Sequence, residues 1–257
     1  MTIALLTAFQ RSGTGALGTV LNQHGQVSYL GEVFLEHDRG QIGNFNSFFL
    51  DLIRENPEFA LPSNAPKTFG RYVGYLETVV SKPIKVIDIK YNCMHHLSSM
   101  VYDHHCLALA VGAGLPIIHL IRRNFLKALV SLDLALINDI WHASLPDALP
   151  RRTLQLATVG LVERLDVYAS ESAMVSAYLR NYGRSAQFDY EEMFNAEGEL
   201  SVEVETFLVN LLDIDGFENR RPHLVKQTHD DLAMVIENYD EVANVLSATP
   251  YQWMLRD

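Results

Sequence analysis

The residues best suited to chemistry lie in the segment Gln10-Arg11-Ser12-Gly13-Thr14-Gly15-Ala16, which follows the apolar run Ile3 to Ala8. Small residues between an apolar strand and a helix start form a turn whose free backbone N–H groups and helix dipole attract an anion. Arg11 adds a fixed positive charge, and Ser12 and Thr14 add hydroxyl donors. The segment matches neither the Walker A pattern GxxxxGK[ST] nor GxGxxG. It therefore predicts a phosphate-like anion site, with an ordinary strand–helix turn as the alternative.

A second basic site ends another apolar run, Ile117 to Ile121. Arg122 and Arg123 follow this run directly, and Ser131 lies eight positions after Arg123. An arginine at a strand end and a hydroxyl on the next helix can bind one phosphate, because the guanidinium gives forked bonds and the hydroxyl a neutral donor. The alternative is a pair of exposed charges. Two such sites in one acidic chain favour the phosphate interpretation.

Short apolar runs alternate with helical patterns along the whole chain. We expect strands at 3–8, 27–30, 85–91, 116–121 and 186–190, and helices that include 100–113, 126–140, 153–182 and 231–246. This alternation predicts an α/β fold with three layers, α/β/α, around a central, mostly parallel five-stranded sheet, in one domain over residues 1–257. Ligands bind at the carboxyl ends of such strands. We expect four segments at this edge of the sheet: the two basic motifs, the pair Gly31-Glu32 and the pair Lys90-Tyr91.

Composition excludes several classes of protein. The 257 residues carry 20 Lys and Arg against 31 Asp and Glu, a net charge of −11, which argues against a nucleic-acid-binding surface. The two cysteines form no disulfide framework, and the start lacks a basic signal-peptide region. The longest apolar run, about 106–118, is too short for a membrane span. We therefore expect a cytoplasmic protein with no membrane span.

No metal site is expected. The adjacent pairs His95-His96 and His104-His105 make poor ligand sets, because neighbouring helical residues point about 100° apart. An HExxH motif is absent from the sequence.

Together the motifs resemble the signature elements of sulfotransferases that use 3′-phosphoadenosine 5′-phosphosulfate. Residues 10–14 resemble the loop that holds the 5′-phosphosulfate, and Arg123-Asn124 with Ser131 resembles the 3′-phosphate site. Residues 31–34 resemble the acidic turn of bacterial carbohydrate-type members, and residues 189–193 resemble their "YE-x-L" strand end. Segments at 225–227, 237–242 and 249–251 resemble the tail of the trehalose- and nodulation-factor-type branch. The resemblance covers about residues 3–251 and implies a P-loop-NTPase-like fold.

The resemblance implies metal-free transfer of a sulfuryl group to a hydroxyl of a carbohydrate, glycolipid or related small metabolite, leaving adenosine 3′,5′-bisphosphate. The implied donor-binding residues are Arg11, Ser12, Gly13, Thr14, Gly15, Ala16, Arg123, Ser131 and Lys226. Arg11 is also implied as a catalytic residue, which would stabilise the departing 5′-phosphate. Glu32 is the first candidate for the catalytic base, since it lies just past a strand end. Glu36 is the second and His37 the third.

Two other functions stay open. A P-loop phosphotransferase or kinase would need a lysine after the loop glycine and an acid for Mg²⁺. A non-catalytic nucleotide-binding protein could share the fold. The acceptor and the oligomeric state, a homodimer included, also stay open, as does whether Arg151 and Arg152 contact the donor.

Overall fold

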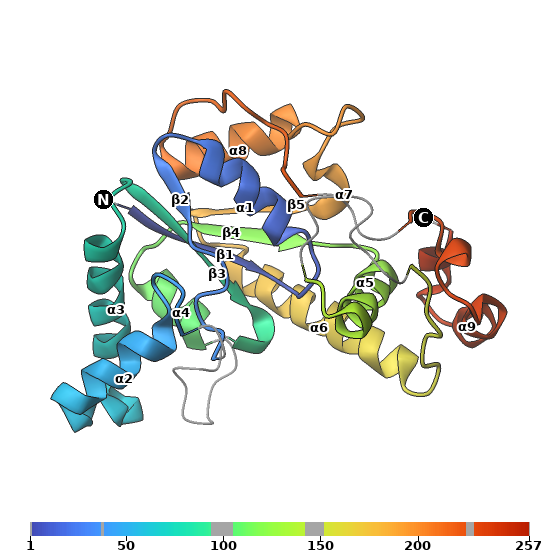
Figure 1. The fold of residues 1–257 in the computed structure, drawn as a ribbon, viewed down its shortest axis with the longest axis horizontal. Coiled ribbons are helices and arrows are strands. Elements are labelled where there is room, and N and C mark those ends of the chain that lie inside the picture. Colours follow the sequence, from blue (N-terminus) through green and yellow to red (C-terminus); the bar gives the residue numbers. More distant parts are fainter. Residues whose placement is uncertain (1, 37–38, 94–104, 142–151, 225–228, 257) are drawn as a thin grey trace.

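The computed structural model describes residues 2–36, 39–93, 105–141, 152–224 and 229–256 (Figure 1). The strands are β1 (Thr2–Ala8), β2 (Val27–Tyr29), β3 (Ile84–Lys90), β4 (Ile117–Ile121) and β5 (Ser185–Asp189). The helices are α1 (Thr14–Gln23), α2 (Phe45–Glu55), α3 (Ala65–Val79), α4 (His105–Gly112), α5 (Phe125–Asn138), α6 (Leu161–Leu179), α7 (Tyr190–Met193), α8 (Val202–Leu212) and α9 (Tyr239–Leu246). Short 3₁₀ turns are η1 (Pro57–Ala60), η2 (Pro62–Asn64), η3 (Tyr91–Cys93), η5 (Leu232–Met234) and η6 (Gln252–Leu255).

The five strands form one sheet in the order β2-β3-β1-β4-β5, and every neighbouring pair is parallel. The predicted five-stranded α/β fold is confirmed. Ala8 at the end of β1 is in register with Lys90 at the end of β3. The loop that follows β1 therefore leaves the sheet beside the end of β3.

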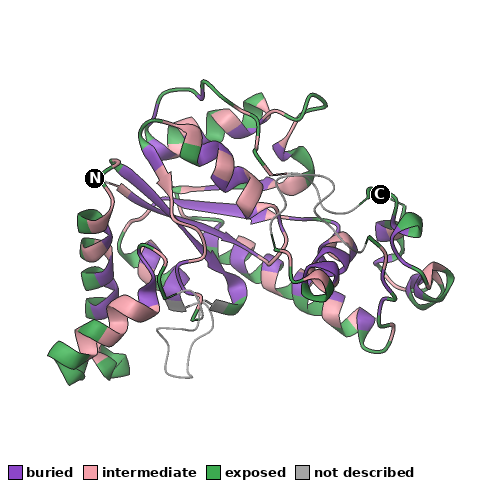
Figure 2. Ribbon diagram, viewed as in Figure 1, coloured by how far each residue is buried: buried purple, intermediate pink, exposed green. Residues whose placement is uncertain are grey.

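Helices cover both faces of the sheet (Figure 1). Ala4, Leu6 and Ala8 pack into one core with buried residues of α1 and α8, whereas Ile3 and Leu5 pack into another with α3, α4 and α6. Alternate side chains of a strand point to opposite faces, so the inner strands β1, β3 and β4 are buried on both sides (Figure 2), whereas the edge strands β2 and β5 are only partly buried. This two-sided burial is why the strands read as almost continuous apolar runs.

A third core joins the C-terminal part of the chain to α5 and the start of α6. Its members are buried apolar residues of three regions: Leu126, Leu129, Val130, Leu154, Leu156, Leu161, Leu165, Leu232, Val235, Ile236, Val242, Leu246, Tyr251 and Met254. Asn124, the N-cap of α5, also donates from its side-chain amide to the Met254 carbonyl, 2.9 Å away. The C-terminal segment is thus fixed beside the loop that follows β4.

Two predicted helices are wrong in part. Residues 153–160 precede α6 rather than belonging to it, and Leu154 pairs with Ile236 in a parallel bridge. The same pairing interrupts the helix expected over 231–246, which is a 3₁₀ turn followed by α9. Gly160, with φ 73°, is the N-cap of α6. The apolar residues Leu154 and Leu156 are buried, and their positions in the sequence resemble the apolar pattern of a helix.

None of the helices in the described ranges is long and apolar enough to cross a membrane. The first part of the helix expected at 100–113 lies outside the described residues, and α4 is described from His105 onward.

Candidate functional site

The loop between β1 and α1 has the turn-and-helix geometry that the sequence predicts. Arg11 and Gly13 both have left-handed backbones, with φ of 62° and 90°. Within the described residues, no side chain caps the N-terminus of α1 and no acid lies in its first turn. Side chains of Asn44, Asn124 and Ser201 cap α2, α5 and α8, whereas α3, α6, α7 and α9 also begin without a side-chain cap. The first N–H groups of α1, including those of Gly15 and Ala16, are therefore left for an anion.

Gly13 is required both by its backbone and by its neighbour Tyr190. A Cβ built on Gly13 would lie 2.4 Å from Cδ2 of the Tyr190 ring, at the start of α7. This contact places the tyrosine directly against the loop between β1 and α1.

Gly13→Ala is expected to lower the free energy of unfolding by about 1–3 kcal/mol, because alanine is strained at this φ and its methyl group overlaps the ring. Gly74→Ala is the matched control, since Gly74 lies in α3 with open space around it. It should raise the same free energy by about 0.5–1 kcal/mol. Urea denaturation of both variants measures the difference. Equal effects of the two would contradict the role given to Gly13.

Arg11 connects the two basic motifs. Its Nε donates to Ser131 Oγ at 3.0 Å, and its Nη1 donates to the Trp141 carbonyl at 2.7 Å. Arg122 Nη1 in turn donates to the Arg11 carbonyl at 2.8 Å. Burial, and then the nearby charge of Arg122, lower the pKa of Arg11, while Glu32 acts in the opposite direction. Two adjacent guanidinium groups at one strand edge suit an anion with several charges.

Arg123 lies in different surroundings from Ser131. It is half exposed, and its guanidinium is 3.2 Å from both Asp189 and Glu192 carboxylates and 3.9 Å from that of Glu191. The structure therefore brings Ser131 to Arg11 and leaves Arg123 among the acids at the end of β5 and in α7. These acids belong to the segment whose resemblance was noted in the sequence.

A buried charge network lies beside the same loop, at the end of β3. Lys90 Nζ is 2.5 Å from Thr14 Oγ1, 2.6 Å from Asp88 Oδ2 and 3.6 Å from Glu32 Oε1. The Tyr29 hydroxyl donates to the same Asp88 oxygen at 2.8 Å. Sequence reasoning missed Asp88 and gave Lys90 no role. The signal that could have revealed this network is the presence of the charged residues Asp88 and Lys90 in a strand that is buried on both faces. Buried charged side chains need partners of opposite charge or hydrogen bonds.

Glu32, the first candidate for the catalytic base, belongs to this charge network through its ion pair with Lys90. It follows Gly31 after β2, and its side chain is 31% exposed. Burial raises the pKa of Glu32 above its ordinary value, although Lys90 acts against this shift and Asp88 adds to it. A carboxylate with a raised pKa accepts a proton more readily near neutral pH.

The other acidic and basic candidates are either exposed or lie outside the residues that the structure describes. Glu36 is exposed on the same loop, where its carbonyl accepts a hydrogen bond from Arg39 Nε at 3.3 Å. Arg152 is exposed. The candidates His37, Arg151 and Lys226 lie outside the described residues.

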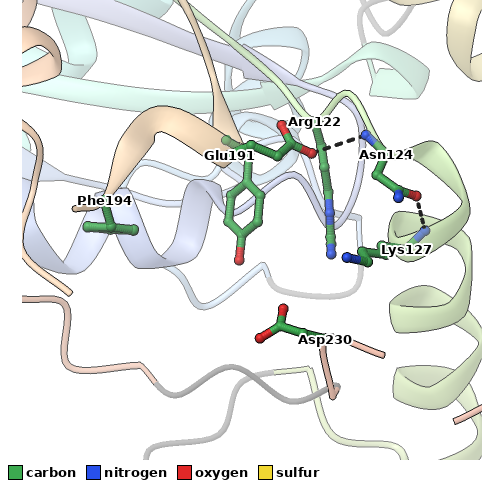
Figure 3. A pocket seen from close by; sticks show the side chains of 7 residues that line it. Arg122, Asn124, Lys127, Glu191, Phe194 and Asp230 are labelled. Atoms are coloured by element: carbon green, nitrogen blue, oxygen red, sulfur yellow. Dashed lines mark hydrogen bonds between the residues drawn. The ribbon is translucent and has the colours of Figure 1, made fainter. Parts of the chain in front are cut away.

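A cavity of about 280 Å³ opens next to the Arg11 loop. Figure 3 shows most of its lining, which is Arg122, Asn124, Lys127, Tyr190, Glu191, Phe194 and Asp230. The Glu191 carboxylate accepts hydrogen bonds from the backbone N–H groups of Arg123 and Asn124, each at 3.1 Å. Those bonds join α7 to the start of α5 along the wall of the cavity.

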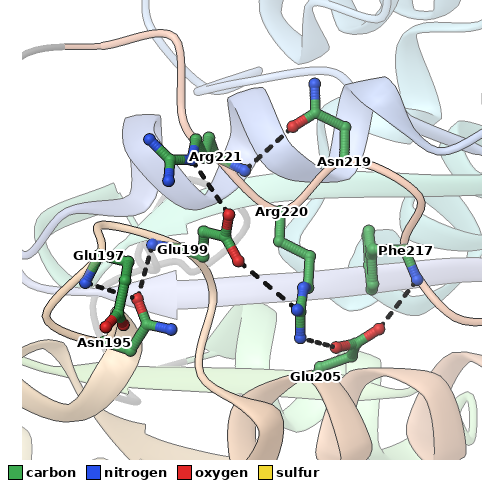
Figure 4. Close-up of polar contacts among 8 residues, drawn as sticks. All are labelled: Asn195, Glu197, Glu199, Glu205, Phe217, Asn219, Arg220 and Arg221. Carbon is green, nitrogen blue, oxygen red and sulfur yellow. Dashed lines mark hydrogen bonds and ion pairs between the residues drawn. The ribbon is translucent and has the colours of Figure 1, made fainter.

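The chain that leads toward Asp230 is anchored upstream of the cavity. Arg220 donates to Glu205 at 3.1 Å and lies 3.5 Å from Glu199, and Arg221 donates to Glu199 at 3.1 Å (Figure 4). The Arg221 carbonyl accepts from Gln23 Nε2 of α1 at 2.8 Å. This part of the chain is therefore held between α1 and α8.

Among the residues that the structure describes, no group of three His, Cys, Asp or Glu side chains could hold a metal ion. Three histidines of the pairs 95–96 and 104–105 lie outside the described residues, and the side chain of the fourth is not described.

Comparisons with known proteins give few matches. No protein-family model matches the sequence, and no curated protein sequence matches it significantly. Among solved structures, the crystal structure of a sulfotransferase from Alicyclobacillus acidocaldarius aligns with 99% of this chain and 96% of that chain, at 14% sequence identity and a TM-score of 0.44. At this score the two backbones superpose too loosely for the likeness to bear on the site.

Proposed function

We propose that the protein is a sulfotransferase that moves a sulfuryl group from 3′-phosphoadenosine 5′-phosphosulfate to a hydroxyl group. The observation that carries this proposal is the convergence of Arg11, Ser131 and the uncapped start of α1 at one sheet edge, beside Glu32 and Lys90. The sequence resemblance described above supports the same donor. Residues 12–16 and Arg11 would hold its 5′-phosphosulfate end.

The demands of the reaction fit these residues. Sulfuryl transfer resembles phosphoryl transfer in needing alignment of the reacting atoms and stabilisation of charge that grows on the leaving phosphate. Arg11 and the first amides of α1 are positive groups on a rigid turn, suited to that charge. Glu32 would take the proton of the acceptor hydroxyl as its oxygen attacks sulfur. Lys90 contacts both Thr14 and Glu32, so it would keep the two halves of the site in register.

Lys90 also weighs against the phosphotransferase alternative. In P-loop phosphotransferases, Mg²⁺ is held by the loop Ser or Thr together with an acid from a neighbouring strand. Thr14 and Asp88 take comparable positions here, but the Lys90 ammonium lies between them and contacts both at 2.5–2.6 Å. The space between these two oxygens is filled by a cation that belongs to the chain, so the donor set does not suit a metal ion.

The acceptor class rests on the sequence resemblance alone. We propose a carbohydrate, glycolipid or related small metabolite, with no nucleic acid as partner, in agreement with the acidic net charge of −11. We further propose one domain over residues 1–257 and a cytoplasmic location. The sequence has only two cysteines and no disulfide framework, which supports a reducing compartment.

The donor is tested by thermal shift with product nucleotides. Adenosine 3′,5′-bisphosphate should stabilise the protein more than adenosine 5′-monophosphate at matched concentration, because only the former has a second phosphate. A tenfold difference in affinity corresponds to about 1.4 kcal/mol. ATP with Mg²⁺ is the third arm and should stabilise less than the bisphosphate. Stabilisation by ATP with Mg²⁺ alone would favour a kinase instead, and turnover with the labelled donor separates an enzyme from a binding protein.

A further inference from the structure

Asp88 is a buried carboxylate of β3 that pairs with the lysine two positions later in the strand. Asp88 is 1% exposed and Lys90 is 2% exposed. Asp88 Oδ2 accepts hydrogen bonds from Lys90 Nζ at 2.6 Å and from the Tyr29 hydroxyl at 2.8 Å. Its other oxygen, Oδ1, is buried and has no hydrogen-bond partner within the described ranges. The buried charge of Asp88 is therefore offset by Lys90, because the tyrosine hydroxyl is neutral.

The Lys90 ammonium lies between two carboxylates at unequal distances. It is 2.6 Å from Asp88 Oδ2 but 3.6 Å from Glu32 Oε1, and it lies 2.5 Å from Thr14 Oγ1. The two short distances are those of charge-assisted hydrogen bonds, whereas 3.6 Å exceeds the length of such a bond. Lys90 is thus bound by Asp88 and Thr14, and Glu32 receives only the longer-range attraction of its charge.

The main chain keeps Glu32 close to this pair. The Asp88 N–H donates to the Gly31 carbonyl at 2.9 Å, so the loop that carries Glu32 is joined to β3 at Asp88 itself. The Tyr29 ring packs against α1, where a Cβ on Gly18 would lie 2.1 Å from Tyr29 Cε1. These contacts fix the hydroxyl donor to Asp88 and the start of the Glu32 loop in one arrangement.

Within the described residues, the charged and titratable groups that act on Glu32 come from three parts of the sheet. They are Lys90 and Asp88 of β3, Arg11 after β1 and Tyr29 of β2. Burial and the charge of Asp88 raise the pKa of Glu32, whereas the charges of Lys90 and Arg11 lower it. How readily Glu32 accepts a proton therefore depends on how far the Lys90 ammonium stays from it.

Loss of the Asp88 charge would change the partner of Lys90. A buried ammonium needs a partner of opposite charge, and Glu32 is the carboxylate that already lies within 3.6 Å. A close ion pair would stabilise the charged form of Glu32 and make it a weaker proton acceptor.

We propose that Asp88 is a positioning residue that holds Lys90 on Thr14 and away from Glu32, which leaves the Glu32 carboxylate free to accept the proton of the acceptor hydroxyl. This inference rests on the proposed function. The proton passes to Glu32 as the hydroxyl oxygen bonds to sulfur and the bond between sulfur and the leaving phosphate oxygen breaks. Asp88 itself contacts neither donor nor acceptor and acts through Lys90.

The first test follows the titration of the Glu32 carboxyl by NMR in protein labelled with ¹³C in its glutamate side chains. Glu32→Gln assigns the signal, and the measurement does not depend on activity. Asp88→Asn keeps the size of the side chain and an acceptor for Tyr29 but removes the charge, so Glu32 should titrate at a lower pH than in the unmodified protein. Tyr29→Phe is the matched control, because it removes the other hydrogen bond to the same oxygen and no charge. It should leave the titration of Glu32 in place.

The second test is the pH profile of turnover at saturating donor. We compare rates about one pH unit below the midpoint of the acidic limb of the unmodified enzyme, each as a fraction of the plateau rate of the same enzyme. This fraction should be about threefold or more larger for Asp88→Asn than for the unmodified enzyme. A merely structural loss would lower the rate at every pH and leave the limb in place.

The double variant Asp88→Asn/Lys90→Met decides if Asp88→Asn does not fold. Removal of a whole buried charge pair is tolerated better than removal of one partner. Glu32 should then titrate at a higher pH than in the unmodified protein, because Lys90 no longer stabilises its charged form. A Glu32 titration unchanged from the unmodified protein would show that the pair does not act on Glu32 and overturns the inference.

The outcomes separate this inference from the proposed function. A folded, unmodified protein that neither transfers the sulfuryl group nor binds adenosine 3′,5′-bisphosphate contradicts the proposed function, wherever Glu32 titrates. An active unmodified enzyme whose Glu32 titration or acidic limb stays in place in Asp88→Asn, or moves to higher pH, overturns only the role of Asp88. A lower titration point together with a displaced acidic limb supports both.

Discussion

Glu32→Gln is expected to lower the turnover of sulfuryl transfer by about 100- to 10,000-fold, the usual contribution of a general base. Glutamine keeps the size and polarity of the side chain but cannot accept the proton of the acceptor hydroxyl. The affinity for adenosine 3′,5′-bisphosphate should change far less than turnover, because the Glu32 carboxylate pairs with Lys90 at 3.6 Å and acts on Arg11 through its charge. Initial rates at saturating donor, with calorimetric Kd values, measure the two effects.

The pH profile of the unmodified enzyme gives a second readout. The base works when it is deprotonated, so turnover should fall as the pH drops through the pKa of Glu32. Burial raises that pKa, with Lys90 opposing and Asp88 adding to the shift, so the fall should begin above the pH at which an ordinary glutamate titrates. The acidic limb should vanish in Glu32→Gln.

The rival candidates are tested by the same measurement. Glu36 is exposed and lies four residues further along the loop, and Glu36→Gln should be nearly silent. An active Glu32→Gln enzyme alongside a folded, donor-binding but inactive Glu36→Gln enzyme would transfer the role to Glu36. His37→Asn tests the third candidate in the same assay.

The second large effect is expected for Arg11→Ala, which should lower turnover by about 100- to 1,000-fold. Arg11 would face charge that grows on the leaving phosphate, so its loss should reduce the rate more than the affinity. Alanine keeps the left-handed backbone conformation at the same strain that arginine already has at φ 62°. The side-chain contacts to Ser131 and Trp141 are lost together with the charge.

Arg11→Lys is the matched control for charge. Lysine keeps one positive charge but lacks the planar guanidinium that donates to Ser131 Oγ and to the Trp141 carbonyl at once. The turnover of Arg11→Lys should therefore lie between that of the unmodified protein and that of Arg11→Ala. Intact turnover in Arg11→Ala would mean that the loop after β1 does not hold the reacting group.

The sequence alone determined the sheet. Strands buried on both faces must be apolar at nearly every position, so the runs at 3–8 and 117–121 were visible, and their alternation with helices required parallel strands. It also determined that the segments after β1, β2, β3 and β4 meet at one edge. Residues 153–160 were misread, because apolar residues that pack on the C-terminal segment look like one face of a helix.

Only the tertiary structure decided which charges face one another. Arg122 and Arg123 are adjacent in the sequence, yet one is buried beside Tyr190 and the other is half exposed among three acids. Ser131 is bound by Arg11, which is 120 positions away, and Lys90 is held between Thr14 and Asp88. Spacing along the sequence determines the face of a helix or strand from which a side chain projects. The partner that a long charged side chain reaches depends on the elements packed around it, and those come from distant parts of the sequence.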